Sequence, residues 1–168
     1  YLVVPDRAAH PLPDTIDTVV GAVIKPLAVA VWAVRRARVG IGHRVLVTGA
    51  GPIGLLVAQV ARAAGAVEVV VTDVNDHRLA VAAELGTTQT INTGATPLAE
   101  DLRVDRVLEC TGVPAVLWTA IRAVRPRGRV TAVGQAAPSV DGRRSATSSA
   151  TRSTWSRRSA TPTPTRPR

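Results

Sequence analysis

Three glycines between an apolar run and a helix-like stretch limit this chain to few folds. Gly49, Gly51 and Gly54 show the spacing G-x-G-x-x-G; they follow the run at residues 45–47 and open the Ala-, Leu- and Val-rich stretch at 53–64. A strand that turns through such glycines into a helix is typical of a dinucleotide-binding unit. The first glycine permits the tight turn, the second lets a pyrophosphate approach the backbone, and the third lets the helix pack closely on the strand. We predict that a dinucleotide binds at this helix N-terminus, where N–H groups are unpaired; the alternative is that these are ordinary turn glycines.

An acidic residue at the expected distance supports this prediction. Asp73 stands about 20 residues after Gly54 and follows the apolar run at residues 67–72. A carboxylate at the end of this second strand accepts hydrogen bonds from the adenosine ribose hydroxyls and repels a 2′-phosphate, which favours NAD over NADP. Arg78 follows in the next helix, where its guanidinium can stack on the adenine or bond the ribose. Asp73 can also serve as the N-cap of that helix, and both roles are compatible.

Strand-like and helix-like segments alternate along most of the chain. Apolar residues at helical spacing predict helices, and short β-branched runs predict strands. The helices are predicted at residues 19–37, 53–64, 75–85 and 114–124, and the strands at 45–47, 67–72, 90–91, 106–109 and 128–133, with a short strand at 2–4. Pro26 is expected to kink the first helix or to end its first turn. The alternation predicts an α/β fold, a doubly wound parallel sheet with helices on both faces.

Two further segments, residues 109–112 and 133–135, follow predicted strands and should lie on the same edge of the sheet. The carboxyl ends of parallel strands meet at one rim, where ligands bind. Cys110 belongs to this rim, although a small buried residue is a better interpretation of it than a reactive thiol. The candidate cofactor-binding residues are Gly49, Gly51, Pro52, Ile53, Gly54, Asp73, Arg78, Cys110, Thr111, Val133, Gly134 and Gln135.

Most of the positive charge lies in the C-terminal segment. The formal net charge is +9, but residues 143–168 carry seven arginines and no acid, so the rest of the chain is nearly neutral. This segment is rich in Ser and Thr and has few apolar residues, and we predict that it is a disordered tail. The alternative function for the chain is a non-catalytic, basic-tailed protein that binds nucleic acid or other polyanions. Nucleic acid is the weaker prediction, because Trp155 is the tail's one aromatic residue.

Composition excludes several other classes of protein. A single cysteine excludes an internal disulfide framework and a cysteine-based zinc site built from this chain alone. No apolar run approaches the length of about 20 residues that a membrane span needs. The chain begins at Tyr1 with no secretory signal pattern, so we expect a cytoplasmic location and no membrane partner.

Residues 1–135 resemble the medium-chain zinc-dependent dehydrogenases, most closely the sorbitol (polyol, L-iditol) dehydrogenase branch. The matching stretches include YLVVPDRAAHPLP, VLVTGAGPIGLL, VVVTDVNDHRLAVAAELG, VLECTG and GRVTAVG. The resemblance implies a Rossmann-type NAD-binding domain, hydride transfer between a secondary alcohol or polyol and NAD, and a homo-oligomer. It implies that Ile53 contacts the pyrophosphate or nicotinamide side, and that Asp73 and Arg78 contact the adenosine. It also implies that Val133, Gly134 and Gln135 contact the nicotinamide half.

The chain departs from this family in its metal ligands. In the family a preceding catalytic domain supplies the zinc ligands, so we expect this chain alone to bind no metal and to be inactive. The family reads GALIEPL where this chain reads GAVIKPL, and Lys25 therefore stands where the family has an active-site glutamate. We divide the chain into a remnant of the catalytic domain at 1–18, the cofactor-binding domain at 19–142 and the tail at 143–168.

The tail also departs from the family, and a shifted reading frame explains how. The polyol branch continues with a motif resembling Phe-Arg-Tyr-Ala-Asp-Thr-Tyr. Written in GC-rich codons and read one nucleotide late, that motif gives Ser-Ala-Thr-Pro-Thr-Pro-Thr, which is the sequence of residues 159–165. We predict that the chain from about residue 143 is a frameshifted continuation, so that the sheet lacks its last strands; the nucleotide sequence read in the other frame tests this.

Overall fold

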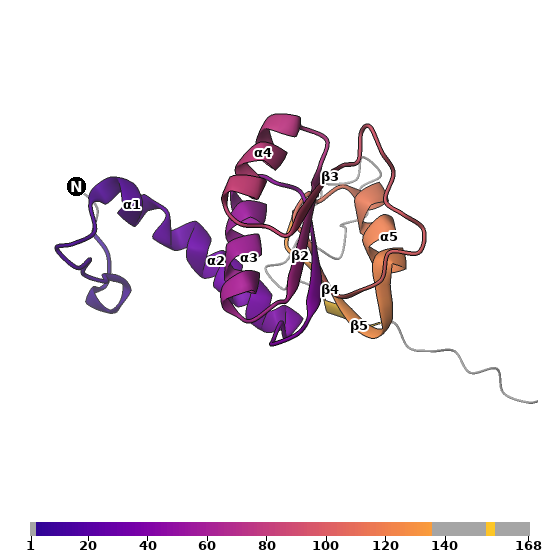
Figure 1. The fold of residues 1–168 in the computed structure, drawn as a ribbon. Coiled ribbons are helices and arrows are strands. Elements are labelled where there is room, and N and C mark those ends of the chain that lie inside the picture. The colour runs from indigo at the N-terminus through magenta and orange to yellow at the C-terminus, as the bar shows by residue number, and fades with distance from the viewer. Residues whose placement is uncertain (1–2, 136–153, 157–168) are drawn as a thin grey trace, which may run out of the picture.

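The computed structural model describes residues 3–135 and 154–156, and its centre is one six-stranded sheet (Figure 1). The order across the sheet is β3-β2-β1-β4-β5-β6. The strands are β1 (Arg44–Thr48), β2 (Glu68–Asp73), β3 (Gln89–Asn92), β4 (Val104–Glu109), β5 (Val124–Ala132) and β6 (Thr154–Ser156). The first five run parallel, and β6 pairs antiparallel with β5.

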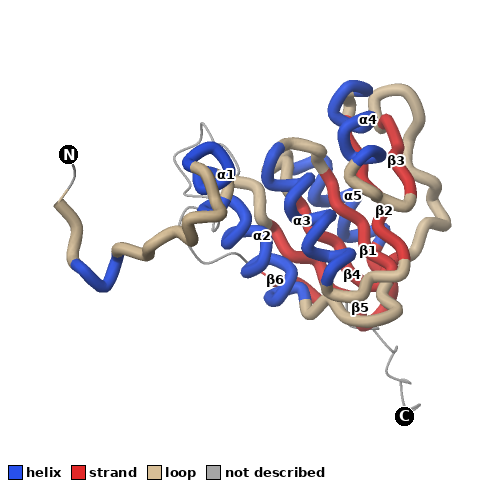
Figure 2. The backbone as a smooth tube through the Cα atoms, turned by 60° about the vertical axis from the view of Figure 1, so that its left-hand side comes forward, coloured by secondary structure: helices blue, strands red, loops and turns tan. Residues whose placement is uncertain are grey.

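Helices cover both faces of the sheet. They are α1 (Thr18–Ala22), α2 (Ile24–Ala37), α3 (Pro52–Ala63), α4 (Asp76–Glu84) and α5 (Pro114–Ala123), after a 3-10 turn at Asp6–Ala8. Helices α3 and α4 lie on one side of the sheet and α5 on the other, and the chain before α2 extends away as an arm (Figures 1 and 2). None of the helices among the described residues combines the length and apolarity of a membrane-crossing segment.

Two apolar layers result, because the inner strands are buried on both faces. Val45 and Val47 pack in the layer formed with α2, α3 and α4, whereas Leu46 packs in the layer formed with α5. The alternation of strands and helices read from the sequence is thus confirmed, and so is the predicted doubly wound α/β fold.

The differences from the predicted elements have local causes. The helix predicted at 19–37 is two helices, with α1 ending at Ala22. Pro26 stands four residues later, where its ring would clash with the Ala22 carbonyl and supplies no N–H to it. The short strand predicted at residues 2–4 is wrong for Val3 and Val4, which are in neither strand nor helix and whose side chains are exposed with no strand beside them.

The tail predicted to be disordered at 143–168 lies outside the described residues, except for Thr154–Ser156. These three residues form β6, which differs from the expectation of a tail without regular structure. Strand β5 would otherwise present unpaired backbone groups at the edge of the sheet, and the backbone of β6 pairs with its Arg129–Thr131 stretch.

Candidate functional site

The predicted site residues come together at the carboxyl edge of the sheet. Strand β1 lies between β2 and β4, and the chain leaves β1 toward one face and β4 toward the other. A crevice opens at such a switch point, and open α/β sheets bind their ligands there. The loops that follow β1, β2, β4 and β5 all reach this edge. The candidate cofactor-binding residues lie in these loops, at the end of β2 and in the first turns of α3 and α4, where α4 carries Arg78.

Two of the three glycines are required by backbone packing. Gly49 has a φ of 93°, and its N–H donates to the Thr72 carbonyl at 2.7 Å. A Cβ on Gly54 would lie 1.8 Å from the Gly49 carbonyl oxygen, so the helix could not approach the strand. The first and third glycines therefore hold the turn closed, as the spacing predicts.

The second glycine faces open space at the start of α3. Nothing lies within 4 Å of the position that a Cβ on Gly51 would take. Gly51 is the N-cap of α3, Pro52 follows within the first turn, and no side chain caps that turn. By contrast, the Asn75 side chain caps α4 by accepting from Arg78 N at 3.1 Å. The uncapped N–H groups of α3 and the space over Gly51 fit a phosphate-bearing ligand.

The Asp73 carboxylate joins the glycine turn to the segment before α4. Its side chain is 8% exposed. One oxygen accepts from Ala50 N at 2.7 Å, and the other accepts from the amides of Val74 at 2.8 Å and Asn75 at 3.0 Å. The Arg78 guanidinium lies 4.0 Å away and is more than half exposed. Asn75 rather than Asp73 is the N-cap of α4, so the alternative role for Asp73 as that cap is wrong: Asp73 ends β2, two residues too early.

Glu109 organises the loop after β4, a role that sequence reasoning missed. Only 2% of this residue is exposed. Its carboxylate accepts from the amides of Thr111 at 2.6 Å and Gly112 at 3.0 Å and from the Thr111 hydroxyl. The sequence did offer a signal for this role: an acidic residue ends an apolar strand and stands shortly before Thr-Gly.

The loops after β1, β4 and β5 touch one another. The Glu109 carbonyl accepts from Val133 N at 2.7 Å and from Gly134 N at 2.9 Å. A Cβ on Gly134 would lie 2.2 Å from Gly112 N, and one on Gly49 would lie 2.9 Å from Thr111 Cγ2. Thr111, Val133 and Gly134 therefore stand together at the carboxyl edge of the sheet, where α3 begins with Pro52 and Ile53. Gln135 is exposed at the end of its loop.

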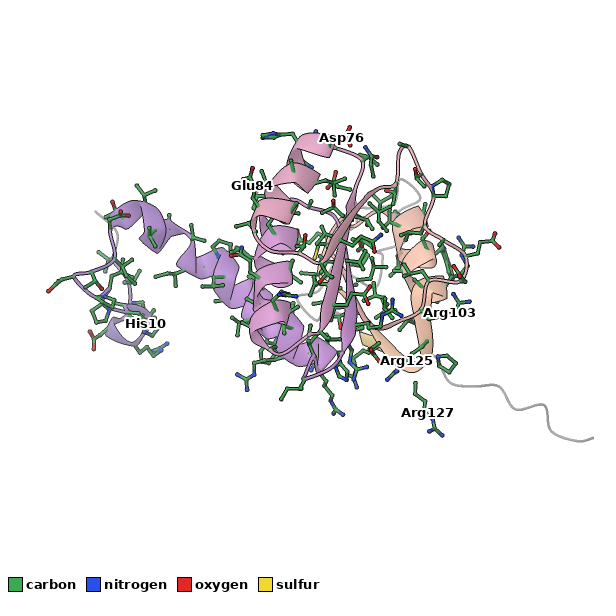
Figure 3. All side chains as sticks on the ribbon, viewed as in Figure 1. His10, Asp76, Glu84, Arg103, Arg125 and Arg127 are labelled. Carbon is green, nitrogen blue, oxygen red and sulfur yellow. The ribbon has the colours of Figure 1, made fainter. Side chains whose placement is uncertain are left out.

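Lys25 does not join this group. It lies in the first turn of α2 with its side chain exposed, where the helix extends away from the sheet (Figure 1). The described residues also bring together no group of three or more His, Cys, Asp or Glu side chains that would fit a metal ion. Figure 3 shows His10 on the N-terminal arm, well away from Asp76 and Glu84 on α4. Residues 3–135 and 154–156 therefore do not fit a zinc site.

Cys110 lies at the start of the loop after β4, and its surroundings favour the protonated form of its thiol. Its Sγ lies 3.8 Å from the Leu108 carbonyl oxygen. Burial, and secondarily the negative charge of Glu109, raise the pKa of the thiol far above its usual range. The protonated thiol is a poor nucleophile at neutral pH.

Alkylation of the native chain by iodoacetamide at about pH 8 should therefore be at least about tenfold slower than alkylation of the urea-unfolded chain. Mass spectrometry reports the rate without ambiguity, since the chain has one cysteine. Equal rates in the two states would contradict the buried, protonated thiol.

Comparisons with known proteins agree with this geometry. The family described as zinc-binding dehydrogenase matches residues 52–159. Sorbitol dehydrogenase of Mus musculus is 40% identical over an alignment of 141 residues, and the match covers 79% of this chain and 40% of that protein. A zinc-binding dehydrogenase structure from Sinorhizobium meliloti 1021, bound to NADP, has a TM-score of 0.74 and 32% identity over 79% of this chain and 42% of that one.

A second solved structure, described as a short chain alcohol dehydrogenase from E. coli CFT073 and complexed with NADH, has a TM-score of 0.73 and 29% identity, covering 77% of this chain and 40% of that chain. The chain spans about two-fifths of the length of the relatives it matches. With the family match covering more than half of its residues, the chain belongs to the zinc-binding dehydrogenase family.

Proposed function

We propose that this chain is the NAD-binding half of a zinc-dependent polyol or secondary alcohol dehydrogenase. The observation that carries the proposal is the buried Asp73 carboxylate, which is fixed at the tip of β2 beside a glycine turn whose Gly51 faces open space. The polyol substrate class rests on the likeness to sorbitol dehydrogenase.

The residues divide between the parts of the cofactor. The amides of Ile53 and Gly54 at the N-terminus of α3 would hold the pyrophosphate over Gly51, because the helix N-terminus carries partial positive charge. Asp73 and Arg78 would hold the adenosine ribose. The nicotinamide half would contact the joined loops after β4 and β5, through Cys110, Thr111, Val133, Gly134 and Gln135. The bound cofactor supplies the carbon that accepts hydride.

Charge favours NAD over NADP at this site. The Asp73 carboxylate would stand against the 2′-phosphate of NADP at the edge of the adenosine pocket. The Arg78 guanidinium, at 4.0 Å, offsets only part of that repulsion, because most of it is in solvent. The two similar structures hold NADP and NADH respectively, so the family uses both cofactors.

Calorimetric titration of the chain with NADH and with NADPH tests the proposal. NADH should bind saturably and at least about tenfold more tightly than NADPH. Asp73→Ser should reduce that ratio by removing the repelling charge, whereas Glu84→Gln, which removes a charge from the far end of α4, should leave it unchanged. Absence of a saturable signal at millimolar NADH would refute binding.

The domain division and the assembly belong to the same proposal. Residues 19–142 form the cofactor-binding domain, residues 1–18 are the end of a catalytic domain that holds zinc, and the family's chains associate as homo-oligomers. On this proposal the chain by itself turns over no alcohol, because its described residues offer no zinc ligand set.

A further inference from the structure

Arginines gather at the amino edge of the sheet, opposite to the candidate cofactor site. These arginines come from the end of α2 and the residue after it, the start of β1, the first half of β4, and β5. Figure 3 shows Arg125 and Arg127 at this edge and Asp76 at the other. The cluster is formed by Arg36, Arg38, Arg106 and Arg129, and we call it the arginine cluster.

The acids at this edge already have other partners. Glu68 pairs with Arg44, with Nε and Oε2 2.5 Å apart. Asp105 pairs with Arg125 and also accepts from Arg44 N at 2.8 Å. Among the described residues, no member of the arginine cluster forms an ion pair with a carboxylate.

Two members of the cluster are fixed against the end of α2. Arg106 Nε donates to the Arg38 carbonyl at 3.1 Å, and Arg129 donates through one terminal nitrogen to the Arg36 carbonyl at 3.3 Å. Cations commonly bond the free carbonyls at a helix C-terminus, which explains why these two are there. Arg106 is held further by a bond from one terminal nitrogen to the Asp105 carbonyl at 2.9 Å and by a contact of the other with His43 Nε2 at 3.4 Å. The helix-end role does not account for the exposed side chains of Arg36 and Arg38, nor for the second terminal nitrogen of Arg129, which has no hydrogen bond among the described residues.

Arg106 and Arg129 each stand beside other cations. Burial, and then the charges of Arg38 and Arg36, lower the pKa of Arg129. Burial also lowers the pKa of Arg106, where Asp105 opposes the shift and Arg129, Arg125 and Arg38 add to it. A bound anion would relieve this repulsion, since several partly desolvated cations face it at once.

We propose that the arginine cluster binds a compact oligophosphate, a ligand with two or three adjacent phosphate groups. Planar guanidinium groups bind phosphate oxygens through paired N–H donors, and groups fixed in advance lose little freedom on binding. The cluster is concentrated at the end of one helix rather than spread along a groove, which suits a short, densely charged ligand better than a polynucleotide. This inference stands apart from the proposed cofactor site, which lies at the opposite edge.

The test uses the full chain and inorganic tripolyphosphate as the probe. Calorimetry measures the binding of tripolyphosphate at several salt concentrations. The double variant Arg36→Gln/Arg38→Gln should bind tripolyphosphate at least about tenfold more weakly, with a shallower dependence on salt. The matched control, Arg7→Gln/Arg122→Gln, removes the same charge from exposed positions outside the cluster and should bind as the parent does. Arg129→Gln tests a fixed member, and circular dichroism checks that each variant is folded.

Three results would overturn the proposal. Unchanged binding by the Arg36→Gln/Arg38→Gln variant would assign the phosphates to the C-terminal arginines. An equal loss in the control would show that only net charge matters. Tighter binding of polyuridylic acid than of tripolyphosphate, lost in the same double variant, would make the cluster a nucleic-acid surface instead.

Discussion

Replacing Gly54 with alanine should destabilise the chain by about 3 kcal/mol or more, and NADH binding should be lost with it. The new Cβ would lie 1.8 Å from the Gly49 carbonyl oxygen and 2.9 Å from its carbon, which are backbone atoms that no side-chain rotation can move. Either α3 leaves the strand or the turn opens. Urea denaturation followed by circular dichroism measures the change in unfolding free energy.

Gly51→Ala is the matched control, and it should separate binding from folding. Its Cβ meets nothing within 4 Å, so the free energy of unfolding should change by less than about 1 kcal/mol. The same methyl group occupies the space proposed for the pyrophosphate, so NADH binding should still weaken at least about tenfold. If the two variants are equally stable, the packing argument for Gly54 is wrong.

The second large loss of unfolding free energy is expected from replacing Glu109. Glu109, itself only 2% exposed, is the acceptor for the Thr111 and Gly112 amides, so Glu109→Ala should cost about 3 kcal/mol or more in unfolding free energy. Thermal unfolding followed by circular dichroism should show the loss, together with weaker NADH binding as the loop loosens.

Glu68→Ala is the control for that loss. Glu68 also sits on the sheet and bonds Arg44, but that pair is partly solvated, and losing it should cost no more than about 1 kcal/mol. Equal losses in the two variants would contradict the loop-organising role of Glu109.

The sequence was sufficient for the elements whose signals are local. The glycine spacing, the acid about 20 residues later and the helical and strand periods depend on neighbours in the chain, and the parallel sheet follows from their alternation. The break between α1 and α2 was foreseen at Pro26, although the helix ends at the residue whose carbonyl the ring would strike.

Features made by distant residues were not predictable in this way. In the sequence, Glu109 is only a polar residue at the end of a strand. Its role is visible only in the folded structure, where the loop after β4 donates hydrogen bonds to its carboxylate. The arginine cluster joins Arg36 to Arg129, 93 positions apart, so composition assigned the charge to the tail alone. Strand β6 depends on an edge that exists only once β5 is in place.

The hydrogen bonds that the two carboxylate oxygens of Asp73 accept have a consequence for the redesign of such domains and for their divergence. The carboxylate that is to discriminate between cofactors also anchors Ala50 of the glycine turn and shapes the entry to α4. Selection for a new cofactor at this position therefore acts at the same time on the rigidity of the phosphate loop. A lineage that abandons the acid needs a compensating acceptor for the Ala50 amide, so changes of cofactor preference should come as paired substitutions rather than as single steps.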